Sequence, residues 1–194
     1  ARLAEHAGFD AAGPNDHQLS ISAPDNHTAK ILPPCSKYVG IFAGSANDPA
    51  KRWPVGSFAH LINLLHQKWG VHPVLFGNNA DRSVNDAIIA VCKTEVANLS
   101  GIGLTDLSRA LMQCRMVVSN DTGGAHLSAA LGRPTAVVFG PTDPMRSCPR
   151  GEHVVQLSTQ RFCQPCGYDE CPLDHACMET LSPDQVLTKL EELW

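Results

Sequence analysis

The chain has 194 residues, of which 43% are hydrophobic and 18% are charged. That length allows one well-buried domain, and the composition excludes a disordered chain. The net charge of −4 argues against a nucleic-acid-binding protein, which would present a basic face. No apolar run is long enough to span a bilayer, and the first residues lack the pattern of a signal peptide. The sequence therefore predicts a cytoplasmic protein without a transmembrane segment.

The first part of the chain, residues 1–36, is polar and contains Pro14, Pro24 and the pair Pro33-Pro34. Prolines at this density interrupt regular structure, so only residues 2–8 have a helical pattern. We therefore expect a connector between domains over residues 1–36 and one domain over residues 37–194.

In residues 37–194, short apolar runs alternate with helical patterns. This order predicts an α/β fold, a Rossmann-like parallel sheet of about six strands with helices on both faces. Pro73 argues mildly against the second strand, because proline cannot donate to a sheet ladder. Thr105 is expected to cap a helix, and Ser182 with Gln185 predicts a capping box before the last helix. The expected strands are 38–42, 71–76, 96–99, 116–118, 135–139 and 153–157.

The centre of the pattern is residues 115–144, which read as a strand, a glycine turn, a helix and a second strand. Such a turn lies at the amino end of its helix, where free N–H groups favour an anion. Asn120, Asp121 and Thr122 could equally serve only as helix caps. The second loop, Gly140-Pro-Thr-Asp-Pro, favours a ligand cleft between the two turns, although Asp143 in it is also a common turn-forming residue.

Further candidates follow the other expected strands. Lys51 is placed to meet a phosphate as a mobile point charge, or is simply solvated. Asp81 could accept a ribose hydroxyl, or only interact with a helix dipole. Ile102 and Leu104 are plausible walls for an adenine ring. His126, in the first turn of the central helix, could bind a sugar or phosphate oxygen, or brace the turn.

The cysteines form a separate motif. Four of the eight lie close together as Cys163-x2-Cys166-x4-Cys171-x5-Cys177, with His175 among them. Four thiolates, or three and the histidine, could surround a tetrahedral zinc ion. The spacing departs from paired Cys-x2-Cys knuckles, however, so buried free thiols are the alternative interpretation.

Three stretches in the same order carry a family resemblance: AKRWP, SNDTGGAHLSAALGRPTAVVFGPTDP and CQPCGYDECPLDHACM. From about residue 38 to the end, the chain resembles the nucleotide-sugar-binding half of glycosyltransferase family 9, the ADP-heptose lipopolysaccharide heptosyltransferases. The resemblance implies a two-domain enzyme of the GT-B type, of which this chain is the second domain.

The resemblance also implies a function. The chain would bind ADP-heptose and need no catalytic cofactor. The other domain would supply the catalytic base, an Asp, and would bind the lipopolysaccharide inner-core acceptor. No catalytic residue is therefore expected in this chain, and membrane contact, if it occurs, is peripheral. Combined with the positions above, the expected nucleotide-sugar-binding residues are Ser45, Lys51, Asp81, Asp121, Thr122, Gly123, Gly124, His126 and Asp143.

Two alternatives stay open at this point. One is another nucleotide-sugar transferase, or an epimerase, with the same two-domain plan. The other is a stand-alone nucleotide- or zinc-binding module without catalysis, because doubly wound sheets host many functions.

Overall fold

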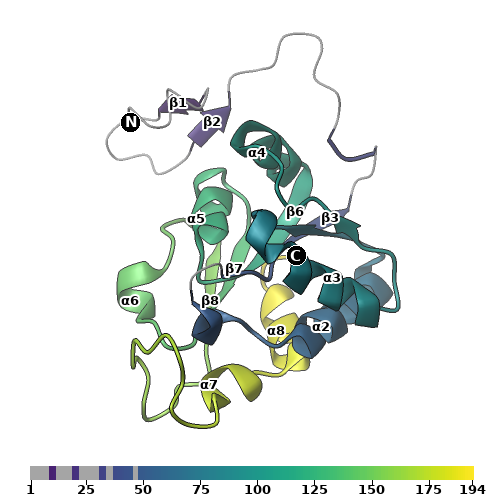
Figure 1. The fold of residues 1–194 in the computed structure, drawn as a ribbon. Coiled ribbons are helices and arrows are strands. Elements are labelled where there is room, and N and C mark those ends of the chain that lie inside the picture. The colour runs from purple at the N-terminus through teal and green to yellow at the C-terminus, as the bar shows by residue number, and fades with distance from the viewer. Residues whose placement is uncertain (1–8, 12–18, 22–30, 34–36, 46–47) are drawn as a thin grey trace.

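The computed structural model describes residues 9–11, 19–21, 31–33, 37–45 and 48–194. Its main element is a six-stranded parallel sheet with the strand order β5-β4-β3-β6-β7-β8 (Figure 1). This confirms the predicted α/β class. The strands are β3 (Tyr38–Phe42), β4 (His72–Phe76), β5 (Ala97–Asn98), β6 (Cys114–Asn120), β7 (Thr135–Val138) and β8 (Val154–Leu157).

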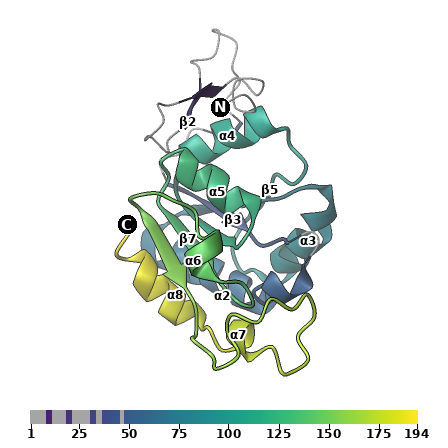
Figure 2. The same cartoon turned by 90° about the vertical axis from the view of Figure 1, so that its left-hand side faces the viewer.

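Helices cover both faces of this sheet. One core cluster joins the sheet to α2, α3 and α8, and a second joins it to α4 and to Leu127 of α5, so the two groups lie on opposite sides (Figure 2). β3, β6 and β7 are almost entirely buried, as expected for strands covered on both faces. The longer helices are α2 (Val55–Trp69), α3 (Arg82–Val91), α4 (Leu104–Gln113), α5 (Gly123–Ala130) and α8 (Pro183–Leu190).

Short helices occupy several of the connections between strands and helices. The 3-10 turns η1 (Pro49–Lys51) and η2 (Asn79–Asp81) precede α2 and α3. Two one-turn helices, α6 (Pro144–Ser147) and α7 (Ala176–Glu179), follow β7 and β8. No helix among the described residues combines the length and apolar character needed to cross a membrane.

Pro73 does belong to a strand, and the sheet explains why. His72 N donates to Lys37 O at 2.8 Å, so the next backbone nitrogen, that of Pro73, points away from β3. On that side β5 pairs only with Val74 and Leu75. The missing N–H of Pro73 therefore lies beyond the end of β5 and removes no ladder hydrogen bond.

Two local predictions differ from the structure, and one is confirmed. The N-cap of α4 is Gly103, without a side-chain cap, so Thr105 lies inside the helix; an extended glycine is an acceptable N-cap. Within residues 1–36, β1 (Phe9–Ala11) and β2 (Leu19–Ile21) form an antiparallel pair that the connector prediction missed. The expected helix at residues 2–8 lies outside the described residues. The capping box of Ser182 and Gln185 is present.

Candidate functional site

The loops that follow β3, β4 and β6 surround a cavity of about 540 Å³ at the carboxyl edge of the sheet. One side of this cavity is apolar, formed mainly by the start of α4, and the other side is polar, formed by the loops and the first turn of α5. We call it the carboxyl-edge cavity. Its lining includes five of the expected binding residues and both expected adenine walls: Ser45, Asp81, Thr122, Gly123, Gly124, Ile102 and Leu104.

Asp81 has two different carboxylate oxygens. Oδ2 accepts a hydrogen bond from Asn78 N at 3.0 Å and completes a capping box with Asn78. Oδ1 is buried and has no hydrogen-bond partner among the described residues. A buried acceptor of this kind is normally satisfied by water or a ligand. Asp81 therefore serves the local fold with one oxygen, while the other is buried without a partner beside Gly44, which also lines the cavity.

Two glycines of the central turn have different surroundings. A Cβ on Gly124 would lie 2.5 Å from Phe42 Cδ1, so only glycine lets α5 approach β3 so closely. A Cβ on Gly123 would meet nothing within 4 Å, and Gly123 lines the cavity. Gly124 is thus required for packing, whereas a side chain at Gly123 would enter the space available to a ligand.

Charged side chains meet beside the central turn. Lys51 Nζ lies 3.4 Å from Asp48 Oδ2 and 4.0 Å from Asp121 Oδ2. Ser147 Oγ donates to the same Asp121 oxygen at 3.2 Å. Asp121 is 7% exposed, so its carboxylate is held between a cation and a hydroxyl. Lys51 is therefore shared between two carboxylates in this structure and does not stand as an isolated cation.

The capping alternative for the central turn is not supported by the hydrogen bonds. Thr122 is the N-cap of α5, but its side chain makes no cap hydrogen bond; its hydroxyl lies 3.2 Å from Ser119 Oγ instead. Because no side chain caps α5, its first N–H groups stay available to an anion.

Sequence reasoning missed the residue that holds these loops together. Asn120 is completely buried; its Oδ1 accepts from Trp53 N at 3.1 Å and its Nδ2 donates to Ala43 O at 2.8 Å. It thereby joins the turn after β6 to the loop after β3. A polar residue at the end of an otherwise apolar strand was the signal that could have found it.

Four expected residues are not among those that line the carboxyl-edge cavity: Lys51 and Asp121, which pair beside it, and His126 and Asp143. His126 is exposed on α5 and is not among the residues that line the cavity. Asp143 is the N-cap of α6, where its Oδ1 accepts from Met145 N at 2.9 Å. The structure thus engages Asp143 in its own turn, which matches the turn-forming alternative for this residue.

The four clustered cysteines, Cys163, Cys166, Cys171 and Cys177, line a separate small cavity of about 90 Å³. His175 Nε2 lies 2.7 Å from Ala50 O, to which it is hydrogen-bonded. Among the described residues, no group of three or more His, Cys, Asp or Glu side chains is arranged to hold a metal ion. Burial raises the pKa of the Cys177 thiol, and the three neighbouring thiols raise it further. The residues described do not form a zinc site, and of the four free thiols only Cys177 is buried, so the buried-thiol interpretation holds for that residue alone.

The fold and the position of the cavity define a class of protein. Parallel sheets with helices on both faces bind ligands at the carboxyl ends of their strands, where the strand order reverses. Here the order reverses between β3 and β6, and the carboxyl-edge cavity lies beside the ends of these two strands. The chain is a Rossmann-like domain with the carboxyl-edge cavity at that switch point.

Comparison with known proteins identifies the family. The model of glycosyltransferase family 9 (heptosyltransferase) matches residues 1–177. The chain belongs to this family. The chain spans about half the length of the relatives it matches.

Individual relatives agree with this assignment. The chain is 32% identical over 162 residues to lipopolysaccharide heptosyltransferase 2 of Escherichia coli K12, covering 80% of this chain and 46% of that protein. The structure of E. coli ADP-heptose lipopolysaccharide heptosyltransferase II superposes with a TM-score of 0.72 at 28% identity, over 81% of this chain and 46% of that one. E. coli heptosyltransferase WaaC with ADP gives a TM-score of 0.66 at 26% identity, over 84% and 46%.

Proposed function

We propose that this chain is the donor-binding domain of a heptosyltransferase, which transfers a heptose from ADP-heptose to the lipopolysaccharide inner core. The carrying observation is the carboxyl-edge cavity, which combines an apolar wall, the free oxygen of Asp81 and the uncapped amino end of α5. The family and the heptosyltransferase names of the relatives support the same donor, as does the ADP in one related structure.

The parts of the donor match the parts of the cavity. The adenine ring lies against the apolar side formed by Ile102, Leu104 and Leu107, where a flat ring replaces water. A ribose hydroxyl donates to Asp81 Oδ1, which satisfies an acceptor that is otherwise buried without a partner. The diphosphate lies at the start of α5, beside Thr122, where N–H groups and the helix dipole favour negative charge.

Lys51 and Asp121 act together on the leaving group. When the diphosphate arrives, Lys51 exchanges part of its pairing with Asp121 for a phosphate oxygen within reach of its flexible side chain. As the bond to the sugar breaks, negative charge grows on the diphosphate, and the cation and the α5 N–H groups offset it. This half of the enzyme thus binds the donor and stabilises the leaving group.

The remaining parts of the reaction are assigned to the other half. Deprotonation of the acceptor hydroxyl needs a general base, which we place there together with the acceptor site and any peripheral membrane contact. The described cysteines are free thiols, as in proteins of reducing compartments, which supports a cytoplasmic location.

Calorimetric titration of this chain with ADP, UDP and ADP-heptose tests the proposal. We expect ADP to bind more tightly than UDP, with modest affinity because one side of the ligand stays in water, and we expect no transfer. Absence of binding for all three nucleotides would contradict the site, and turnover by this chain alone would contradict its role as half of an enzyme.

A matched pair of lysine variants sharpens the test. Lys51→Gln should weaken ADP binding by at least tenfold, about 1.4 kcal/mol. Lys37→Gln is the control, because Lys37 is exposed and donates to Trp69 O at the opposite, amino end of β3. Equal ADP affinity in the two variants would remove Lys51 from the diphosphate site.

A further inference from the structure

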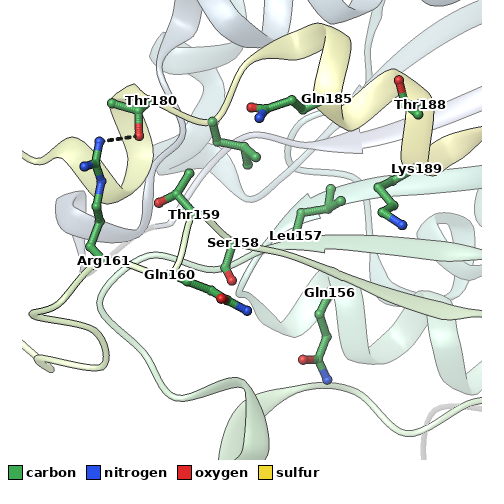
Figure 3. A pocket seen from close by; sticks show the side chains of 11 residues that line it. Gln156, Leu157, Ser158, Thr159, Gln160, Arg161, Thr180, Gln185, Thr188 and Lys189 are labelled. Carbon is green, nitrogen blue, oxygen red and sulfur yellow. Dashed lines mark hydrogen bonds between the residues drawn. The ribbon is translucent and has the colours of Figure 1, made fainter.

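A second and larger cavity, of about 630 Å³, lies between the end of β8 and α8. We call it the β8–α8 cavity. Figure 3 shows Gln156, Ser158 and Gln160 on one wall and Gln185, Thr188 and Lys189 on the other. It shares no residue with the carboxyl-edge cavity, so the proposed donor site does not account for it.

Most of the residues that line the β8–α8 cavity are polar by type, and the charged ones among the described lining residues are cationic. Seven of its residues carry a neutral amide or hydroxyl, and two, Arg161 and Lys189, are cationic. Neither Asp nor Glu occurs among the described residues that line it. Leu157 and Leu181 are its apolar members. The carboxyl-edge cavity, in contrast, offers Phe42 and several aliphatic side chains. Among the described residues that line it, the β8–α8 cavity has no aromatic side chain on which a nucleotide base could stack.

The charge of Arg161 is held in position. Its NH2 donates to Thr180 Oγ1 at 2.9 Å, and the Thr180 hydroxyl donates to Ala176 O at 2.7 Å. This orients the guanidinium while leaving most of its five N–H groups for a ligand. Lys189 is exposed, as Arg161 is, and pairs with Glu192 at 2.8 Å, so part of its charge is already balanced. Arg161 is thus the cation of this cavity that has no carboxylate partner among the described residues.

The α8 wall of this cavity is anchored in the core. Val186 and Leu190 hold α8 there with no exposed surface. Trp53 Nε1 donates to Leu181 O at 3.0 Å in a buried position, which fixes the segment before α8. The backbone of this wall therefore loses little freedom when a ligand binds, which lowers the entropic cost of binding.

We propose that the β8–α8 cavity binds an anionic sugar, a saccharide that carries a phosphate or a carboxylate. Its volume lies in the range of about 300–1,000 Å³ that is usual for small-molecule sites. A guanidinium binds both kinds of anion in a forked geometry. The amides and hydroxyls of both walls can donate to and accept from sugar hydroxyls. This inference does not depend on the proposed donor site.

The test is a titration of this chain with glucose 6-phosphate, glucuronate, glucose and inorganic phosphate, followed by calorimetry and by chemical shifts of the cavity residues. We expect at least one of the two anionic sugars to bind about tenfold more tightly than glucose or phosphate, or about 1.4 kcal/mol. Comparison of glucose 6-phosphate with glucuronate shows whether the cavity prefers a phosphate or a carboxylate. Binding of inorganic phosphate as tight as that of the sugars, or absence of binding by either anionic sugar, would overturn the proposal.

Two pairs of variants locate the site. Arg161→Gln should weaken binding about tenfold, whereas Arg150→Gln, at an exposed arginine outside the cavity lining, should not. Thr188→Glu adds a carboxylate to the α8 wall and should also weaken binding, whereas Thr188→Gln, of the same shape without the charge, should retain it. Equal affinities within both pairs would overturn the proposal. Thermal unfolding checks that each variant is folded, and unchanged ADP affinity separates this site from the donor site.

Discussion

The central turn, residues 119–126, and the cysteine segment, residues 163–177, both carry residue types that can hold a ligand, although for the cysteines buried free thiols were the alternative. In the turn, the buried Asn120 ties together two loops that are far apart in the chain. In the cysteine segment, the side chains are mostly half-buried or exposed, and the thiols form no metal-binding group among the described residues. Residues that can bind a ligand form a site when several loops of the sheet hold them close together. Their spacing along the chain does not by itself bring them together.

The largest expected effect tests the buried link in the central turn. Asn120→Ala leaves Trp53 N and Ala43 O buried without their partner, which should lower the free energy of unfolding by about 3 kcal/mol. Asn63→Ala is the control, because Asn63 makes an exposed hydrogen bond to Lys93 N and should change the free energy by less than about 1 kcal/mol. Urea unfolding measures both. Similar losses of unfolding free energy in the two variants would mean that the hydrogen bonds of Asn120 do not stabilise the turn more than an exposed hydrogen bond does.

A pair of glycine variants separates packing from ligand space within the same turn. Gly124→Ala presses a methyl group against Phe42 and should cost about 2 kcal/mol of stability, as overpacking does. A Cβ at Gly123 would meet no neighbour within 4 Å, so Gly123→Val should leave stability within about 1 kcal/mol. In the same titration it should weaken ADP binding by filling the carboxyl-edge cavity. The assignment fails if Gly123→Val binds ADP as the wild type does.

The cysteine segment makes a prediction about pH. Because burial and neighbouring thiols raise the pKa of Cys177 in the folded state, the protonated thiol favours folding. This contribution is fully present below the ordinary pKa of 9.0 and is lost as the pH rises above it. We therefore expect wild type to lose stability between pH 8 and pH 10.5 by more than Cys177→Ala does. Identical pH profiles from urea unfolding would show that Cys177 has no such effect.

The smallest effect on stability is expected in the cysteine segment, at a partly exposed cysteine. Cys163→Ser should change the free energy of unfolding by less than about 0.5 kcal/mol, as at most surface positions, because Cys163 is only half-buried. Elemental analysis of protein purified without chelator should find no stoichiometric zinc or iron. A full equivalent of metal that disappears in Cys163→Ser would restore the metal hypothesis.

Much of the fold could be predicted from the sequence, because strands buried on both faces read as apolar runs, and the motif AKRWP with the central turn identified the family. Residues whose role depends on distant partners could not be predicted. The partners of Asn120 lie in loops that precede it by many residues, and the cap at Gly103 has no side chain to signal it. The β8–α8 cavity combines three segments whose side chains are individually ordinary surface residues, so it becomes visible only in three dimensions.

The position of β3 at the switch point also bears on how the protein is made. β3 pairs with β4 on one side and with β6 on the other, and β6 follows β4 by more than a helix and a strand. During synthesis the first three strands of the main sheet can assemble while the second edge of β3 still lacks its partner. That edge is a row of apolar residues with open hydrogen-bonding groups, which is the kind of surface that pairs with other nascent chains. Long-range parallel pairing of this sort also folds slowly. The emergence of β6 is thus the step at which β3 gains its second partner and stops being an edge strand.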